Sequence, residues 1–378
     1  MPAIAVAAHT PLHDWHAANG GRMVDFAGWS MPIQYGSIVE EHQATRTAVG
    51  LFDISHMGRT LISGLDAGKL LESLLTRRIG DLKPGQVRYS LVCNESGGVL
   101  DDVLAYRVEV PANDLLGYGL VINASNRDKI DAHLRGHASG HDVAIEDVSD
   151  KYAMIAVQGP KAIELLDPVT DCELTSFRYY TGEMSSFTAQ GIEPVECYVS
   201  RTGYTGEDGC EIICPADRAV DVWQALIDMA MPIGGGPVGL AARDTLRLEA
   251  GMPLYGHELT EDINPIAAGL SFAVNLKDRE FVGREALVAA RKDSQQSIRI
   301  GLQLDGRRPA REGATVLQGD QPVGTVTSGT FSPTFDRPLA MAYVKPSAAG
   351  IGEHLAVDIR GKVVGATVAP LPFYQRGK

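Results

Sequence analysis

The sequence lacks the features of membrane, exported and nucleic-acid-binding proteins. No window approaches the roughly 18 uninterrupted apolar residues that a membrane-spanning helix needs. The N-terminal stretch MPAIAVAAHTPLHDW has no basic n-region and no arginine, so we expect neither a signal peptide nor a mitochondrial presequence. The 34 lysines and arginines are outnumbered by 47 acidic residues, giving a net charge of −13, which disfavours phosphate-rich partners. We therefore expect a cytoplasmic protein with no membrane and no nucleic-acid partner.

Cysteine is scarce, and several common catalytic or nucleotide-binding motifs are missing. The five cysteines are odd in number and contain no CxxC pair, so we expect reduced thiols in a reducing compartment. The P-loop pattern GxxxxGK[ST] is absent, as are GxSxG and HExxH. These absences argue against a P-loop nucleotide site, a nucleophile-elbow hydrolase and a zinc protease of the HExxH type.

The order of predicted elements indicates an α+β protein. With 378 residues, and about 150 residues per domain as a prior, we expect two or three domains. Helical patterns and strand-like runs are mixed up to about residue 296, and short strands with turns follow, which indicates a small C-terminal barrel or jelly-roll-like unit. Helices are predicted over 12–20, 37–48, 65–76, 126–135, 217–230, 239–250 and 284–292.

One glycine pattern imitates a dinucleotide-binding fingerprint. Gly234, Gly236 and Gly239 spell GxGxxG, and a helical pattern follows them. The fingerprint needs a strand directly before it, whereas here the predicted helix 217–230 precedes the glycines. We therefore predict a loop between helices rather than a nucleotide site.

Three histidines imitate a metal site. His133, His137 and His141 recur every fourth residue, as ligands on one helix face would. Gly136 and Gly140 interrupt that helix, and neither carboxylate nor cysteine completes a ligand set. A solvated helix end is the favoured interpretation.

Two adjacent aspartates interrupt the apolar stretch GGVLDDVLAY, residues 97–106. Strand alternation puts Val99, Asp101, Val103 and Ala105 on one face, and Leu100, Asp102, Leu104 and Tyr106 on the other. The second face has the larger apolar groups, so we expect it, and Asp102 with it, to face the interior. A buried carboxylate needs a cation, backbone donors or a ligand. Alternatively, both aspartates cap the Gly-Gly turn and form local salt bridges.

A glycine-rich stretch, RTGYTGEDGCEI, covers residues 201–212. Gly203, Gly206 and Gly209 recur every three residues around Tyr204, and they allow the main chain to approach a flat ligand closely. Glu211 begins an apolar strand, where its carboxylate can bind two parallel N–H donors such as a pterin edge presents. The alternative is a glycine-rich hairpin with incidental acids.

Two arginines share a face of the predicted helix in GLAARDTLRLEAG, residues 239–251. Arg243 and Arg247 are four residues apart and suit a ligand with a carboxylate-bearing tail. Asp244 and Glu249 could instead be their salt-bridge partners, and spacing does not separate the two interpretations.

Several long segments together resemble the glycine cleavage system T protein, the aminomethyltransferase family. The resemblance implies an α+β, three-domain cloverleaf around a central folate channel. Its first domain would comprise 1–50 plus 146–275, its second 51–145, and its C-terminal β-barrel domain 285–378. The segments are MVDFAGWSMPIQY (23–35), VGLFDISHMG (49–58), YSLVCNESGGVLDD (89–102), VQGPKA (157–162), SRTGYTGEDGCEI (200–212), GLAARDTLRLEAGMPLYG (239–256) and GTVTSGTFSPT (324–334).

The resemblance also implies a reaction. Tetrahydrofolate would take the methylene carbon of an aminomethyl group on the lipoyl arm of the H protein. Ammonia and the dihydrolipoyl arm would leave, giving 5,10-methylenetetrahydrofolate. Tetrahydrofolate would be a co-substrate, and no metal, flavin or nucleotide would be required.

Site residues follow from the resemblance position by position. Asp102 matches the family's catalytic aspartate, which would hydrogen-bond folate near N10 and orient N5. Glu211 would read the pterin edge, and Arg243 would lie near the acidic tail of folate. The remaining folate-binding candidates are Tyr204, Tyr89, Met57, Asn123 and Arg376.

Two alternatives share this scaffold. A folate-dependent demethylase of a methylated sulfur, nitrogen or oxygen compound would be expected to change the acidic pair or the TSGTFSPT segment, and both keep the transferase form here. A non-catalytic folate-binding protein of iron–sulfur assembly would have cysteine in place of Gly203. Phe272 is a departure, because several family members have tryptophan there. The residue stays apolar, so we expect folate packing to be kept with different contact details and the chemistry to be unaffected.

Overall fold

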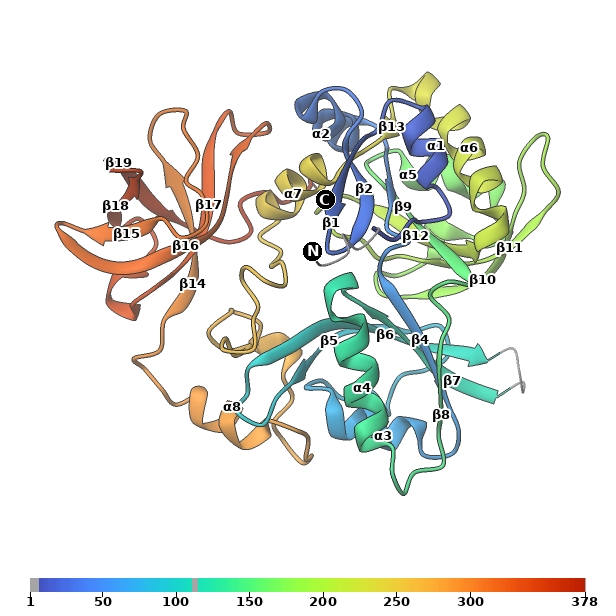
Figure 1. Ribbon diagram of the computed structural model, residues 1–378, viewed down its shortest axis with the longest axis horizontal. Helices are drawn as coiled ribbons and strands as arrows, with labels where there is room; N and C mark the ends of the chain where they lie inside the picture. Colours follow the sequence, from blue (N-terminus) through green and yellow to red (C-terminus); the bar gives the residue numbers. More distant parts are fainter. Residues whose placement is uncertain (1–6, 111–114, 378) are drawn as a thin grey trace, which may run out of the picture. The chain divides into compact units, whose positions relative to one another are not determined.

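The computed structural model describes residues 7–110 and 115–377, and the chain divides into two compact units (Figure 1). The first unit comprises Met1–Leu70, Asp81–Arg88 and Leu104–Arg243, and the second comprises Leu71–Gly80, Tyr89–Val103 and Asp244–Lys378. Among the described elements, α3 (Ala67–Leu74), β5 (Val87–Cys93), β6 (Val99–Val110) and α7 (Leu240–Glu249) run from one unit into the other. Within the described ranges, no helix is long and apolar enough to cross a membrane.

A six-stranded sheet with helices on one face forms the core of the first unit. The strand order is β10-β11-β12-β9-β3-β13. On β12, Cys210, Ile212 and Cys214 pack in one cluster with Trp223 of α6, so alternation directs Glu211 to the opposite face. The elements are β3 (Gly50–Asp53), β9 (Tyr152–Gln158), β10 (Gly182–Phe187), β11 (Val195–Ser200), β12 (Gly209–Pro215), β13 (Gly236–Pro237), α5 (Ala162–Leu166) and α6 (Ala219–Ala230).

A second sheet has the order β5-β6-β7-β4-β8, and antiparallel pairing joins β4 to both β7 and β8. The helix predicted over 126–135 is present as α4, one residue later at its start and two longer at its end. The remaining strands of this sheet are β4 (Gly58–Ser63), β7 (Leu115–Ile122) and β8 (Ala144–Asp147), and α4 (Arg127–His137) lies between β7 and β8 in the sequence. The N-terminal elements of the first unit are α1 (His13–Ala18), β1 (Arg22–Phe26), β2 (Trp29–Gln34) and α2 (Ile38–Thr47).

A buried carboxylate fastens the N-terminal segment to the first sheet. Asp53 accepts hydrogen bonds from Thr10 Oγ1 at 2.7 Å and from the Ser55 amide at 2.8 Å, and its Oδ2 lies 3.0 Å from His16 Nε2. The other nitrogen of His16 lies 2.7 Å from the Tyr35 hydroxyl. Burial raises the pKa of Asp53, but these donors outweigh it and lower the pKa to about 2.

The ionised carboxylate of Asp53 is expected to stabilise the folded state, and protonation of that carboxylate in acid should remove this contribution. Because its folded-state pKa is depressed from 3.8 to about 2, the contribution is complete above pH 3.8 and disappears as the pH falls toward 2. The difference in unfolding free energy between wild type and Asp53→Asn should shrink by about 2 kcal/mol across that window. Denaturant titrations at several pH values measure it. Asp14→Asn, on the exposed side of α1, is the control, and an equally large change there would contradict the assignment.

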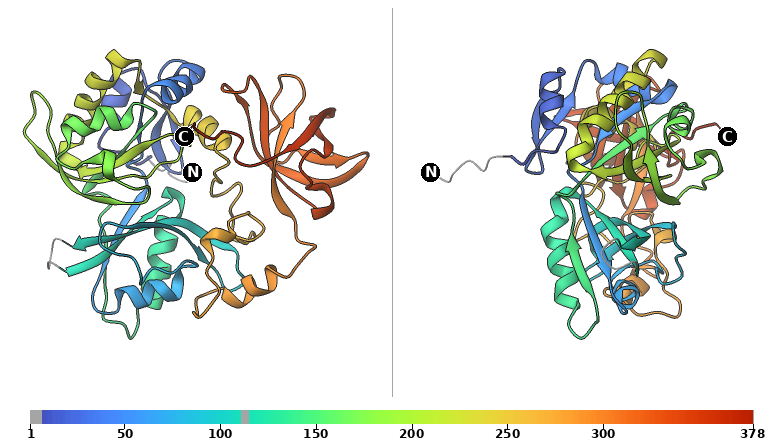
Figure 2. Two further views of the ribbon diagram at one scale, coloured as in Figure 1. Left: turned by 180° about the vertical axis from the view of Figure 1, so that it is seen from behind. Right: turned by 90° about the vertical axis from the view of Figure 1, so that its right-hand side faces the viewer.

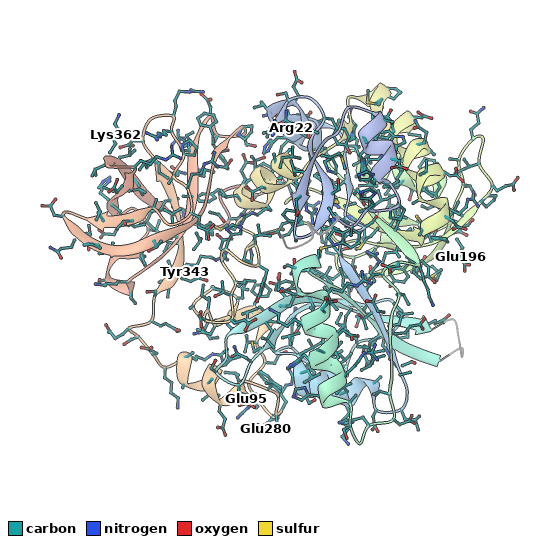
Figure 3. All side chains as sticks on the ribbon, in the orientation of Figure 1. Arg22, Glu95, Glu196, Glu280, Tyr343 and Lys362 are labelled. Atoms are coloured by element: carbon teal, nitrogen blue, oxygen red, sulfur yellow. The ribbon has the colours of Figure 1, made fainter. Side chains whose placement is uncertain are left out.

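The C-terminal part of the second unit is a closed barrel, seen from two sides in Figure 2. Its strand order is β14-β17-β16-β15-β18-β19, and β14 pairs with β19 to close it. Tyr343 of β17, labelled in Figure 3, donates a hydrogen bond to the Glu258 carbonyl at 2.7 Å. The predicted small C-terminal barrel is confirmed. Its strands, and the helix before it, are β14 (Ile298–Leu304), β15 (Thr315–Gln318), β16 (Gln321–Ser332), β17 (Arg337–Val344), β18 (His354–Ile359), β19 (Lys362–Ala369) and α8 (Arg284–Ala290).

Arg247 is a structural residue. Its guanidinium is 2% exposed and forms ion pairs with Glu258 and Asp244, each at 2.8 Å. It also donates to Ser328 Oγ of β16 at 2.8 Å. Since these contacts join the end of α7 to the barrel, the salt-bridge interpretation holds for Arg247, with Glu258 as a partner that lies outside the quoted motif.

The last glycine of the GxGxxG pattern, Gly239, allows close packing of two segments of the main chain. The helix α6 and a 3-10 turn precede the pattern, as the loop interpretation required, and no strand leads into it. A Cβ at Gly239 would lie 2.4 Å from the Ile33 carbonyl oxygen, so the main chain there admits only glycine without movement.

All five cysteines are free and buried. Burial raises the pKa of four of them to about 12, so these thiols stay protonated and unreactive in the folded protein. The four are Cys93, Cys197, Cys210 and Cys214.

Candidate functional site

A row of side chains crosses the face of the six-stranded sheet opposite α6. Register aligns Phe52 of β3 with Ala156 of β9, Ala156 with Glu211 of β12, and Glu211 with Ser200 of β11. Glu211 is 5% exposed, and Thr202 donates its hydroxyl to Oε2. Burial raises the pKa of Glu211, while Thr202 and the Arg243 cation oppose the shift. The face therefore presents one buried carboxylate that can bind N–H donors.

Arg243 lies between two aromatic rings of the same unit. Its guanidinium carbon is 4.9 Å from the ring centre of Tyr204 and 5.9 Å from that of Phe52. The Nη1 atom is buried and has no hydrogen-bond partner among the described residues. Burial lowers the pKa of Arg243, and Glu211 and Tyr204 partly offset this. A buried cation with an unused donor is suited to a ligand acceptor.

The glycines of the 201–212 stretch have separate structural reasons. Gly206 has a φ of +82°, which favours glycine. A Cβ at Gly203 would lie 1.9 Å from Gln158 Oε1, and one at Gly209 would lie 2.2 Å from the Val157 carbonyl oxygen. The stretch thus folds tightly onto β9, and this fixes the loop that carries Tyr204.

Met57 and Asn123 flank the paired ends of two neighbouring strands, since Met57 directly precedes β4 and Asn123 directly follows β7. In the antiparallel pair of β4 and β7, Gly58 aligns with Ile122, so the residue before Gly58 faces the residue after Ile122. Both side chains are half-buried. The structure therefore brings these two predicted residues to one edge of the sheet.

His56 is a site candidate that the sequence interpretation missed. Its ring is 4% exposed, Phe26 makes an edge contact with it at 5.7 Å, and its Nδ1 has no partner among the described residues. Burial lowers its pKa to about 4. The charge of Asp53 acts to raise this pKa and the charge of Arg243 acts to lower it further. The imidazole is therefore neutral at pH 7. The sequence feature that could have identified His56 is its position directly before Met57, a predicted folate-binding residue. Thr202 and Phe52 were missed as well, because neither forms a pattern with its partner in sequence.

In the second unit, Asp102 is half-buried and Tyr89 donates its hydroxyl to Oδ2 at 3.1 Å. The Tyr89 ring stacks on Phe272, with centroids 6.1 Å apart, and Phe272 is 62% exposed. The expected orientation of β6 is wrong, because Asp101 is fully buried and its face is the more deeply packed one. Asp102 is instead on the more accessible face, where a ligand can reach it.

The predicted residues form two sets. Glu211, Tyr204, Arg243, Met57 and Asn123 belong to the first unit. Asp102, Tyr89 and Arg376 belong to the second, with Arg376 half-buried in the segment after β19.

Among the described residues, one group of potential metal ligands converges, and it does not include His133, His137 or His141. His9, His13 and Asp14 have ligand atoms within 4.8 Å of one another. However, the two imidazoles stack in parallel at 3.5 Å, and Asp14 and Ser30 already contact the two nitrogens of His13. Parallel rings do not direct their lone pairs at one ion, so this geometry is poor for coordination.

Comparisons with known proteins agree over nearly the whole chain. A family profile described as "GCVT N-terminal domain" matches residues 12–278, and one described as "Glycine cleavage T-protein C-terminal barrel domain" matches residues 299–375. The "Aminomethyltransferase" of Rubrobacter xylanophilus is 46% identical over 97% of this chain and 94% of its own length. That of Streptomyces coelicolor is 45% identical over 98% of both. The crystal structure of glycine cleavage system aminomethyltransferase T from Bartonella henselae has a TM-score of 0.87 and 34% identity, covering 97% of this chain and 98% of that one. The chain therefore belongs to the glycine cleavage T-protein family of aminomethyltransferases.

Proposed function

We propose that the protein transfers the methylene carbon of an aminomethyl group from the lipoyl arm of the H protein to tetrahydrofolate. The methylene carbon loses its bonds to ammonia and to the lipoyl sulfur, and it forms bonds to N5 and N10 of folate. N5 and N10 of folate each lose a proton, and the departing nitrogen and the lipoyl sulfur each gain one. The products are 5,10-methylenetetrahydrofolate, ammonia and dihydrolipoyl H protein. We also propose the three-domain division at 1–50 plus 146–275, 51–145 and 285–378.

The observation that carries the proposal is the buried carboxylate of Glu211 on the sheet face opposite α6. A carboxylate accepts two parallel hydrogen bonds, which fits the adjacent N–H donors of an aminopyrimidinone edge. Arg243, with its unused donor beside Tyr204, supplies an acceptor-binding group in the same unit. Met57 and Asn123 are proposed to line the pocket, as is Tyr89, and Arg376 is proposed to contact folate.

Asp102 is proposed as the catalytic residue. Its carboxylate would accept a hydrogen bond from folate near N10 and orient N5 toward the methylene carbon. The Tyr89 hydroxyl, which donates to Oδ2, favours the ionised carboxylate. The expected contribution is therefore positioning and electrostatic stabilisation, with no covalent enzyme intermediate.

Turnover with purified protein tests the function. The substrates are tetrahydrofolate and H protein carrying an aminomethyl-lipoyl arm, with ammonia and methylenetetrahydrofolate followed together. We expect both products in equal amounts. Folate binding without either product would refute the transferase and favour a demethylase, to be tested with methylated sulfur, nitrogen and oxygen compounds.

Folate binding is expected to weaken in acid. The ionised form of Glu211 is the one that accepts two donors, and burial raises its pKa, so protonation begins at a higher pH than for an ordinary glutamate. The dissociation constant of tetrahydrofolate should therefore rise as the pH falls, beginning at a higher pH than an ordinary glutamate would cause. Titrations of wild type and Glu211→Gln measure it. If the glutamine variant has the same pH dependence as wild type, another group is responsible.

A further inference from the structure

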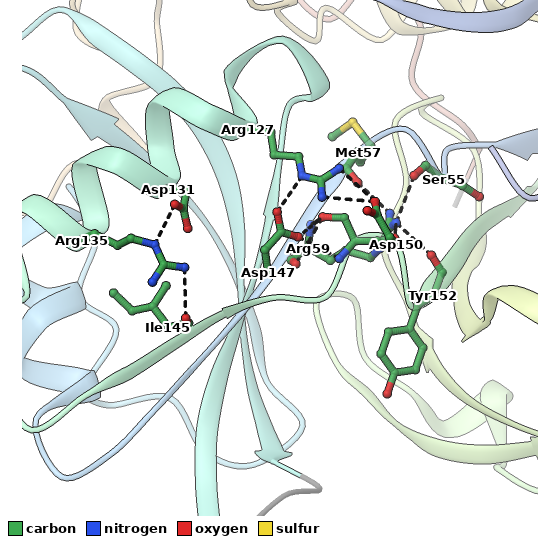
Figure 4. A network of polar contacts seen from close by, with 11 residues as sticks. Ser55, Met57, Arg59, Arg127, Asp131, Arg135, Ile145, Asp147, Asp150 and Tyr152 are labelled. Carbon is green, nitrogen blue, oxygen red and sulfur yellow. Dashed lines mark hydrogen bonds and ion pairs between the residues drawn. The ribbon is translucent and has the colours of Figure 1, made fainter. Parts of the chain in front are cut away.

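Arg59 of β4 directs both terminal nitrogens of its guanidinium at backbone carbonyls within residues 55–57 and 149–152. It donates to Met57 O at 2.7 Å, Ser55 O at 3.0 Å and Tyr152 O at 2.9 Å, and also to Ser149 O (Figure 4). The side chain is buried, and each contact is a charge-assisted hydrogen bond. Arg59 therefore fixes the loop that presents Met57 against the segment between β8 and β9.

A second arginine completes the network. Arg127, the first residue of α4, donates to Asp147 Oδ2 at 2.7 Å and to Asp150 Oδ1 at 3.2 Å. Asp147 Oδ1 accepts hydrogen bonds from the amide and hydroxyl of Ser149, at 2.9 and 2.6 Å. Ser149 Oγ in turn accepts from the Arg59 amide at 2.8 Å. An unbroken chain of polar contacts thus runs from α4 to the Met57 loop.

The network is attached to both sides of the Met57–Asn123 edge. Arg127 lies four residues after Asn123, at the start of the helix that follows it. A Cβ placed on Gly58 would lie 3.4 Å from Arg127 Cγ and 3.3 Å from Ile122 Cβ, so the Arg127 side chain packs directly over Gly58. Movement of Arg127 would therefore disturb the backbone on both strands at this edge.

We propose that Arg59 and Arg127 are positioning residues for tetrahydrofolate, because they fix the backbone that presents Met57 and Asn123. The inference rests on the proposed function. Neither arginine contacts the folate in this proposal, since both terminal nitrogens of Arg59 and all three guanidinium nitrogens of Arg127 donate to protein oxygens. Their contribution is to hold a preformed edge, so that binding does not have to order it.

The decisive variant is Arg127→Gln, with Arg135→Gln as the matched control. Both arginines belong to α4 and each pairs with an aspartate. Arg135 contacts Asp131 at 2.8 Å and the Ile145 carbonyl at 3.2 Å, away from the edge (Figure 4). We expect Arg127→Gln to raise the dissociation constant of tetrahydrofolate about tenfold and Arg135→Gln to leave it within about twofold. The turnover number of Arg127→Gln at saturating folate should remain within about threefold of wild type.

Two further measurements separate positioning from general destabilisation. The melting temperatures of both variants are recorded, and binding is measured well below them, so that only folded protein contributes. Arg59→Lys, which keeps the charge but loses the planar fork, should weaken folate binding in the same direction as Arg127→Gln.

The outcomes separate the two proposals. If wild type binds tetrahydrofolate and Arg127→Gln binds it equally well, or if Arg135→Gln weakens binding as much, the positioning inference is refuted and the proposed function stands. If wild type itself binds no tetrahydrofolate, the proposed function fails and the inference fails with it.

Discussion

Asp102→Asn is expected to reduce the turnover number about 1,000-fold while tetrahydrofolate still binds. The amide has the shape of the carboxylate, so packing beside Tyr89 is kept, but the negative charge is lost. The Tyr89 hydroxyl would then donate to a neutral oxygen, a weaker acceptor than the carboxylate it contacts at 3.1 Å. Single-turnover release of ammonia and methylenetetrahydrofolate measures the loss, and folate titration measures the retained binding.

Asp101→Asn is the matched control for that experiment. The same chemical change is made one residue earlier, on the fully buried face of β6. We expect it to lower the melting temperature and to leave the turnover number of the folded protein within about fivefold of wild type. If Asp102→Asn has near-normal turnover, the carboxylate of Asp102 is not required for catalysis, and this conclusion does not depend on the result for Asp101→Asn.

Glu211→Ala is expected to weaken tetrahydrofolate binding at least about 100-fold. Each hydrogen bond to a charged group contributes about 1.5–3 kcal/mol, and the proposed contact has two. Thr202 would also lose its charged acceptor, and its hydroxyl would keep the contact with Ser200 Oγ at 2.9 Å. Calorimetric or fluorescence titration with tetrahydrofolate measures the change.

A glutamate in the same sheet provides the control for Glu211→Ala. Glu196 of β11, labelled in Figure 3, is exposed, and its alanine variant should bind folate as wild type does. If Glu211→Ala binds tetrahydrofolate as tightly as wild type does, the carboxylate of Glu211 is not part of the folate site. Similar losses in both variants would indicate a general effect on the sheet.

The sequence alone predicted the elements whose signal is local. Helical periodicity located α2 and α6 to within two residues at each end, and the run of short strands after residue 296 indicated the barrel. It could not predict which face of β6 is buried. Alternation separates the two faces of a strand, but the packing partners of Asp101 and Asp102 come from distant segments.

The same limit applies to the site. Glu211 was selected because a carboxylate in an apolar strand is unusual, whereas Thr202 and His56 have no such local signal. Arg59 was missed because it contacts backbone carbonyls 90 and 93 positions away, which leave no side-chain pattern in the sequence. Arg243 and Arg247 looked equivalent by spacing. Tertiary contacts distinguish them, since only Arg247 has a buried carboxylate partner at 2.8 Å in Glu258.

The closure of the barrel has a consequence for synthesis of the protein. Its first strand, β14, pairs with its last, β19, and this register joins Gly301 to Ala369. During translation, therefore, β14 leaves the ribosome long before its second neighbour exists, and the barrel closes only after almost the entire chain has emerged. Until then β14 has an unpaired edge, the arrangement that favours pairing with a strand of another chain. Nascent chains stalled before residue 366 would expose that edge.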